Sequence, residues 1–101
     1  MKNKNIIKYA ELFGWYHSLF TTKQQNYLND YFLNDLSLNE IAKKYHVSSI
    51  AIADSIKHSK KMLDDYENQL HLYKKHNLRN NLYKKITNKT VVKKLLEIDK
   101  I

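Results

Sequence analysis

The sequence contains no cysteine and no proline, and its only glycine is Gly14. Without cysteine the chain has no disulfide, no thiolate metal site and no thiol nucleophile. Proline and glycine are the usual residues of tight turns, so their scarcity favours helices over strands. No apolar run approaches the length of a membrane span, and basic residues 2–8 are not followed by the apolar stretch of a signal peptide. We therefore expect a cytoplasmic, all-α protein without membrane insertion.

Arginine is also nearly absent, since Arg79 is the only one among 18 basic residues. The abundance of lysine, asparagine, isoleucine and tyrosine is what an A+T-rich bacterial genome would produce. An individual lysine therefore carries less functional weight than usual. At 101 residues the chain has the size of one domain with a modest core.

Residues 37–63 carry the spacing of a helix-turn-helix. Ser37 and Glu40 form a capping box, in which each side chain bonds the backbone amide of the other residue. This pattern predicts a helix from residue 38 to about Tyr45. Ser48 is a second N-cap and begins another helix at Ser49. Two capped helices separated by a short turn are the frame of many DNA-binding proteins.

In such proteins the second helix enters the major groove, and its first side chains meet the base edges. Here those side chains are Ser49, Ile50 and Ala53. Bases are discriminated mainly by arginine, lysine, asparagine and glutamine, so this set reads sequence poorly. Two interpretations stay open. Ser48, Ser49, Lys57, Lys60 and Lys61 could contact nucleic acid, or Ile50 and Ala53 could contact a protein.

The positive charge is concentrated in the last third of the chain. Residues 1–70 hold nine lysines against eight acidic residues, whereas residues 71–96 hold seven lysines and Arg79 with no acidic residue. Such a stripe can neutralise phosphates, and the tyrosines within it can stack on unpaired bases. The predicted phosphate contacts are Lys74, Lys75, Arg79, Lys84 and Lys85. The alternative is a solvated, lysine-rich helical face.

The chain is expected to fold as one domain in two parts. Residues 1–76 would form the helix-turn-helix domain, with a first helix largely surrounded by protein and a second helix capped by Thr21 or Thr22. Its fourth helix would run from Ser49 to about residue 77, because no breaker intervenes. Residues 77–101 would form a basic helical extension of the same domain, with Thr87 or Asn88 capping a last helix.

The fourth helix carries a heptad-like apolar seam that continues beyond the first three helices. Its later positions are predicted to contact protein, and they are Leu63, Tyr66, Leu70 and Tyr73. The partner could be the stripe of Leu78, Leu82 and Ile86, or a second copy of the chain. We expect a homodimer that associates through the fourth helix or the C-terminal segment, since this is the commonest symmetric arrangement.

No pattern supports an enzyme. The five histidines do not pair at the three- or four-residue step that places metal ligands side by side, and there is no glycine-rich phosphate loop. We therefore predict no cofactor and no metal.

Residues 9–72 resemble region four of bacterial sigma factors and, more closely, the YlxM family of small helix-turn-helix proteins. The resemblance is carried by three blocks of sequence. The first is Lys-Gln-x-x-Tyr, with Lys23, Gln24 and Tyr27. The second is Ser-Leu-x-Glu-Ile-Ala, with Ser37, Leu38, Glu40, Ile41 and Ala42, and the third is Tyr-Glu-x-x-Leu, with Tyr66, Glu67 and Leu70. The chain departs from the family at residues 49–53, because the family pattern there is Arg-Gln-Ala-Val-Tyr.

This resemblance implies a sigma-like DNA-binding fold and a link to the signal recognition particle, whose genes neighbour those of the family. We expect a regulatory protein that binds DNA or structured RNA, including the RNA of that particle. The alternative is an adaptor that reuses the fold to contact a protein, such as the protein of the particle.

Overall fold

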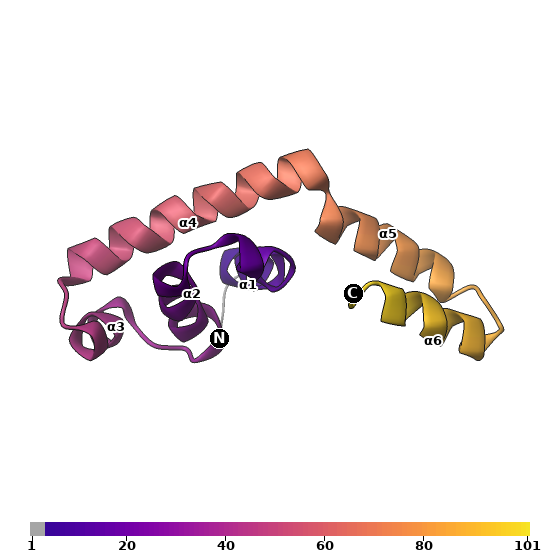
Figure 1. The fold of residues 1–101 in the computed structure, drawn as a ribbon, viewed down its shortest axis with the longest axis horizontal. Helices are drawn as coiled ribbons and strands as arrows, with labels where there is room; N and C mark the ends of the chain where they lie inside the picture. The colour runs from indigo at the N-terminus through magenta and orange to yellow at the C-terminus, as the bar shows by residue number, and fades with distance from the viewer. Residues whose placement is uncertain (1–3) are drawn as a thin grey trace. The chain divides into compact units, whose positions relative to one another are not determined.

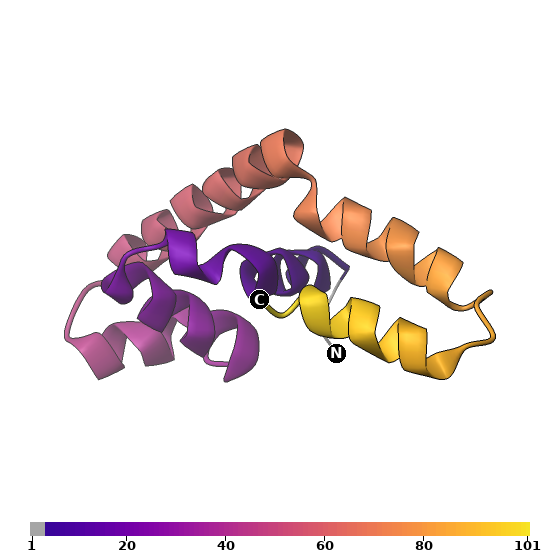
Figure 2. The same ribbon diagram turned by 45° about the vertical axis from the view of Figure 1, so that its right-hand side comes forward.

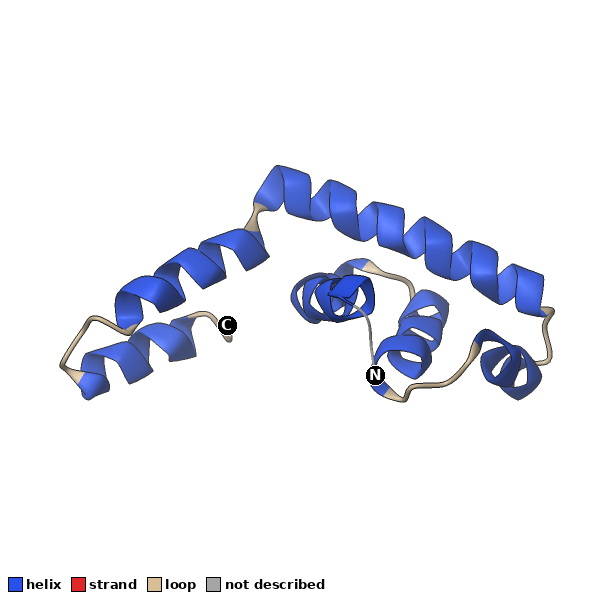
Figure 3. Ribbon diagram, turned by 180° about the vertical axis from the view of Figure 1, so that it is seen from behind, coloured by secondary structure: helices blue, strands red, loops and turns tan. Residues whose placement is uncertain are grey.

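The computed structural model describes residues 4–101, which form six α-helices joined by short loops (Figures 1 and 3). The chain divides into two compact units, Met1–His71 and Leu72–Ile101, the N-terminal and C-terminal units. Over the described residues the all-α prediction is confirmed. None of the helices described is both long and apolar enough to cross a membrane.

The N-terminal unit contains four α-helices and two short helical turns. Their bounds are α1 Lys4–Tyr16, η1 His17–Leu19, α2 Thr22–Leu28, η2 Asn29–Leu33, α3 Leu38–Tyr45 and α4 Ser49–Leu70. Of the two predicted caps of α2, the structure selects Thr21, whose hydroxyl accepts the Gln24 amide at 3.2 Å. After α2 the helix widens into the π-helical turn η2, which the sequence did not predict.

The core of the N-terminal unit lies where α4 crosses α1, α2 and α3 (Figure 1). All of these elements contribute buried apolar side chains, which are Leu12, Phe13, Tyr16, Phe20, Tyr27, Leu28, Phe32, Ile41, Ala42, Ile52, Ile56 and Leu63. On α4 the buried residues recur at three- and four-residue steps, so they form one stripe. Each buried aliphatic side chain contributes about 1.5–3 kcal/mol, and together they hold α4 against the other helices.

One side of α1 is not covered. The sequence predicted a helix largely surrounded by protein, but Ile7 on α1 and Leu19 just after it are each 50% exposed. Within the N-terminal unit α1 packs on α4 and η2 through the side that carries Leu12, Phe13 and Tyr16. The rest of its apolar arc remains open to solvent.

Helix α4 begins at Ser49 as predicted, but its predicted continuation to residue 77 is wrong. The helix ends at Leu70, and His71 adopts a left-handed conformation with φ 55° while its amide donates to the Glu67 carbonyl at 2.9 Å. Glu67 itself accepts a hydrogen bond from Tyr16 of α1 at 2.7 Å. The three residues after Glu67 are exposed, so α4 ends where its packing ends.

The C-terminal unit is a hairpin of α5 (Leu72–Tyr83) and α6 (Lys89–Ile98), which lie side by side (Figure 2). Of the two predicted caps of α6, the structure selects Asn88, which bonds the first turn at 3.1 Å. No residue of either helix is fully buried. Leu78 and Leu82, predicted as an apolar packing stripe, are 56% and 61% exposed. Partly buried side chains therefore hold the hairpin together.

Candidate nucleic-acid interface

The helix-turn-helix is formed by α3, a three-residue turn and the first turns of α4. The Ser37 hydroxyl accepts the Glu40 amide at 3.1 Å and the Glu40 carboxylate accepts the Ser37 amide at 3.0 Å, so the predicted capping box is confirmed. His46 ends α3 in the left-handed conformation, at φ 56°. The Ser48 hydroxyl accepts the Ala51 amide at 3.0 Å, which confirms the second cap.

The exposed end of this motif is a shallow apolar groove between the starts of α3 and α4. Its lining residues are Ser37, Leu38, Asn39, Ser49, Ile50 and Ala53. Ile50 is 73% exposed, whereas Ser49 and Ala53 are half-buried. The three predicted reading residues therefore lie together at one surface. None of the three carries the paired donors and acceptors that discriminate bases.

Charges near this groove nearly cancel. Lys43 on α3 and Lys57 on α4 are exposed, but so are Glu40 on α3 and Asp54 on α4. A hydrogen bond from the Ser37 backbone amide lowers the pKa of Glu40 below its usual value, so this carboxylate is charged at neutral pH. Such a balance gives little attraction for phosphates.

The three lysines predicted on α4 differ in their surroundings. Lys57 is exposed, and Lys61 is exposed with a 3.8 Å ion pair to Asp65 one turn later. Lys60 is instead half-buried, with its ammonium 5.5 Å from the ring centres of both Tyr9 and Tyr31. This packing disfavours the predicted contact of Lys60 with nucleic acid, because its cation is held against the unit's own aromatic rings.

Two of the predicted protein contacts on α4 are also corrected. Leu63 is fully buried inside the N-terminal unit. The Tyr66 ring packs against Tyr16 and Phe20, with ring centres 5.8 and 5.9 Å apart. Both side chains already have partners in their own unit. Of the predicted seam, Leu70 is 45% exposed and Tyr73 is half-buried.

The C-terminal unit holds most of the excess charge. It carries nine basic residues against two acidic ones, a balance of +7, whereas the N-terminal unit has a balance of +1. All eight of its lysines are exposed, and they are Lys74, Lys75, Lys84, Lys85, Lys89, Lys93, Lys94 and Lys100. Exposed ammonium groups at this density can attract phosphates.

Arg79 has a different role from these lysines. Its guanidinium donates to Asp99 at 3.2 Å and thereby ties α5 to the end of α6. The Asp99 carboxylate also lies 3.6 Å from His76, whose other ring nitrogen is 3.0 Å from the Asn80 amide. Arg79 is therefore held in an ion pair within the hairpin, and this pairing competes with its predicted contact to nucleic acid.

A polar groove runs between α5 and α6. Most of the side chains that line it are polar, and two are aliphatic. The lining residues are Asn77, Asn80, Asn81, Tyr83, Lys84, Lys89, Val92 and Leu96. Amides and ammonium groups can donate to phosphates and base edges, and a tyrosine ring can stack on an unpaired base. This groove was not predicted, because only the fold of the hairpin brings residues 77–84 next to residues 89–96.

The chain is similar to proteins of one family. The UPF0122 family, described as "Putative helix-turn-helix protein, YlxM / p13 like", matches residues 3–101. A UPF0122 protein of Malacoplasma penetrans is 42% identical over 99 residues, which are 98% of this chain and 92% of the relative. A UPF0122 protein of Shouchella clausii is 49% identical over 71 residues, which are 70% of this chain and 65% of the relative.

Proposed function

The chain belongs to the UPF0122 family of YlxM-like helix-turn-helix proteins, and on this premise we propose that it is a nucleic-acid-binding protein and not an enzyme. The observation that supports this most strongly is the charge of the C-terminal unit, where eight exposed lysines lie on a hairpin of 30 residues. Binding then depends mainly on phosphates and is steeply weakened by salt.

The polar groove of the hairpin favours a structured RNA with unpaired bases over a plain duplex. Asn77, Asn80 and Asn81 offer hydrogen bonds to base edges, and Tyr83 offers a stacking surface. Duplex DNA can use the same lysines but offers no unstacked base to Tyr83. We expect both nucleic acids to bind, with the structured RNA bound more tightly.

The helix-turn-helix supplies a frame but few base contacts. Ser49, Ile50 and Ala53 occupy the positions that would read a major groove, and Asp54 and Glu40 lie nearby. A serine contact fits almost any base, and the two carboxylates repel phosphates. Sequence selectivity is therefore expected to be weak.

The resemblance to the YlxM family adds a physiological setting. We propose a cytoplasmic, regulatory role in the signal recognition particle pathway, with the RNA of the particle as the bound nucleic acid and its protein as a further partner. Cross-linking in cells, followed by identification of the attached RNA, tests this step. Recovery of chromosomal DNA alone would contradict it.

A second function has one observation in its favour. Ile50 is 73% exposed beside Leu38 and Ala53 in an apolar groove, which suits a protein side chain better than a phosphate. In this alternative the helix-turn-helix is an adaptor surface. An Ile50→Asp variant that loses a protein partner but keeps its nucleic-acid affinity would favour the alternative.

The test of the main proposal compares two variants that remove the same charge. One replaces Lys74, Lys75, Lys84 and Lys85 by Gln in the C-terminal unit, and its matched control replaces Lys4, Lys23, Lys43 and Lys57 by Gln in the N-terminal unit. All eight lysines are exposed. We expect the first variant to lose most of its affinity for structured RNA and for duplex DNA, and the control to lose little. The reverse result would identify the N-terminal unit as the binding surface.

A further inference from the structure

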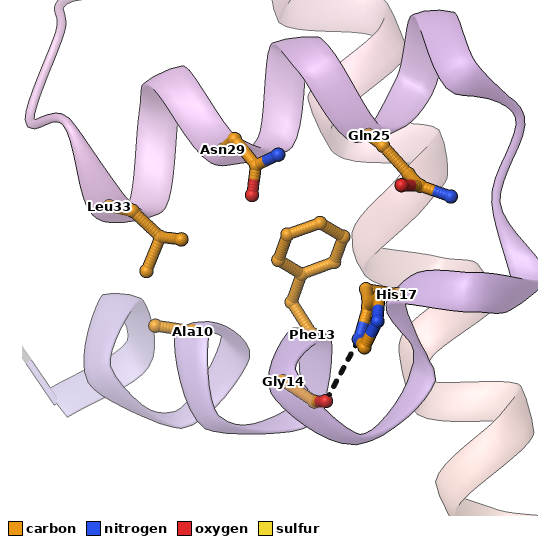
Figure 4. Close-up of a pocket in the computed structure, with 7 residues that line it drawn as sticks. All are labelled: Ala10, Phe13, Gly14, His17, Gln25, Asn29 and Leu33. Carbon is orange, nitrogen blue, oxygen red and sulfur yellow. Dashed lines mark hydrogen bonds between the residues drawn. The ribbon is translucent and has the colours of Figure 1, made fainter.

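A small pocket opens between α1 and the α2–η2 segment (Figure 4). The side chains of Ala10, Phe13 and Leu33 make it apolar, while His17, Gln25 and Asn29 lie around the same space. Its volume of about 140 Å³ suits one aliphatic or aromatic side chain and is well below the 300–1,000 Å³ typical of sites for drug-sized ligands. The pocket therefore suits an anchor residue of a protein partner.

Gly14 lies at the edge of this pocket, and the fold itself does not require a glycine there. A Cβ atom built on Gly14 would meet nothing within 4 Å, and the backbone is ordinary α-helix. Glycine inside a helix costs about 1 kcal/mol relative to alanine. A methyl group at Gly14 would project into open space at the edge of the pocket, where a side chain entering from a partner would meet it. The Gly14 carbonyl lies 3.0 Å from Nδ1 of His17.

Exposed apolar side chains flank the pocket on the same face. Leu33 is 63% exposed while forming one wall of the pocket, and Ile7 is 50% exposed one turn before Ala10 on α1. This is the part of the apolar arc of α1 that α4 and η2 leave uncovered. The exposed side chain of Leu33 thus lies next to a pocket that has the volume of about one side chain.

We propose that this face binds a second copy of the chain, with Leu33 of each copy seated in the Gly14 pocket of the other. In a two-fold symmetric dimer the same surface of each copy contacts the other copy, so it must carry both the inserted side chain and the pocket that receives it. This face carries both, with Leu33 as the inserted side chain. No lysine, arginine, aspartate or glutamate lines the pocket. The pocket itself therefore brings no like charges together, whereas contact between two C-terminal units of charge +7 would.

This dimer differs from the one predicted through the seam of α4. Leu63 and Tyr66 of that seam are used inside the N-terminal unit, whereas Ile7, Gly14 and Leu33 are not needed there. The inference does not depend on nucleic-acid binding. It concerns the full chain in the absence of any ligand.

Sedimentation equilibrium of the full-length protein tests the proposal. We expect a reversible dimer at micromolar concentration, and we expect Gly14→Ala to weaken it by about tenfold or more, as for the loss of a central interface contact. The same substitution should leave the melting temperature unchanged or raised, because alanine favours the helix. Leu33→Ala should weaken the dimer similarly, and the matched control Ile50→Ala should not. A monomeric wild-type protein, or a Gly14→Ala variant that dimerises normally, overturns the proposal.

The absence of native cysteine allows a direct check of the geometry. Two single variants, Gly14→Cys and Leu33→Cys, are mixed and oxidised, so that any 14–33 disulfide must join two chains. A disulfide needs Cα atoms about 4.4–6.8 Å apart, so a bridge between positions 14 and 33 of two chains forms readily only where these positions meet. We expect the mixture to give far more cross-linked dimer than a mixture of Gly14→Cys with Ile50→Cys. Equal yields in both mixtures would overturn the contact.

Discussion

The phenol of Tyr45 donates a hydrogen bond of 2.6 Å to the carboxylate of Asp30, which is only 3% exposed. The same carboxylate accepts the Lys44 ammonium at 3.0 and 3.1 Å and the Asn34 amide at 2.9 Å. Asp30 lies in η2, while Lys44 and Tyr45 form the last turn of α3. This cluster therefore fixes the helix-turn-helix against the rest of the core.

Removal of the central carboxylate should be costly. Asp30→Ala leaves the Tyr45 hydroxyl and the Asn34 amide without their acceptor, and we expect it to lower the free energy of unfolding by about 2–3 kcal/mol. The matched control is Asp54→Ala, since Asp54 is exposed on α4. Urea denaturation followed by circular dichroism measures both. Equal stability of the two variants would contradict a structural role for the cluster.

The cluster also predicts a pH dependence. Burial raises the pKa of Asp30, but hydrogen bonds from Tyr45, Asn34 and Lys44 outweigh it, so the pKa lies below its usual value. A lowered carboxyl pKa stabilises the fold at neutral pH, and this contribution is lost as the pH falls below about 4. The hydrogen bond to Asp30 raises the pKa of Tyr45, so a second loss is expected as the pH rises above about 10.

This dependence can be measured against an isosteric variant. The stability advantage of the wild type over Asp30→Asn should shrink as the pH falls from 7 towards 3, because the wild-type carboxylate becomes protonated. Thermal unfolding of both proteins across this range gives the difference. A difference that does not vary with pH would mean that Asp30 is not ionised in the folded protein.

The capping box of α3 yields a separate stability prediction. Ser37→Ala removes the acceptor of the Glu40 amide and should cost about 1 kcal/mol. Ser37→Gly should cost only a few tenths of a kcal/mol, because glycine tolerates the cap position. Chemical denaturation of the two variants separates these values. If neither substitution has an effect, the start of α3 does not limit stability.

Two neighbouring lysines of α4 should behave differently. Lys60→Gln removes a cation from above the rings of Tyr9 and Tyr31 and should lower stability by about 0.5–1 kcal/mol without changing nucleic-acid affinity. Lys57→Gln, at an exposed position, should leave stability unchanged. Denaturation and binding assays on both variants test the contrast. A loss of affinity in Lys60→Gln would mean that its side chain turns outward on binding.

Local signals in the sequence were sufficient for the starts of α2, α3, α4 and α6. Each of these helices begins at an N-cap residue whose side chain bonds a backbone amide three residues later. Both partners of such a bond are close in the sequence, so the cap can be recognised from the sequence alone. The apolar seam predicted on α4 likewise forms one stripe in the structure, on which Ile52, Ile56 and Leu63 are buried.

Features that depend on distant residues could not be predicted. Helix α4 ends at Leu70 and is capped by His71 in the left-handed conformation. A glycine is the usual signal for such a helix end, but the only glycine of the chain is Gly14. The sequence therefore contains no sign that α4 ends here. The burial of Asp30 depends on Lys44 and Tyr45, 14 and 15 residues away. The pairing of Arg79 depends on Asp99, which becomes its neighbour only when the hairpin forms.

The central claim is that the lysines of the C-terminal unit carry the affinity for nucleic acid. The most direct measurement is the slope of the logarithm of the binding constant against the logarithm of salt concentration, for the wild type and the two four-lysine variants. The account predicts that replacing Lys74, Lys75, Lys84 and Lys85 by Gln reduces the slope by roughly three to four, about one per lost phosphate contact, while the N-terminal control stays near the wild-type slope. An unchanged slope in the C-terminal variant, with a reduced slope in the control, would contradict it.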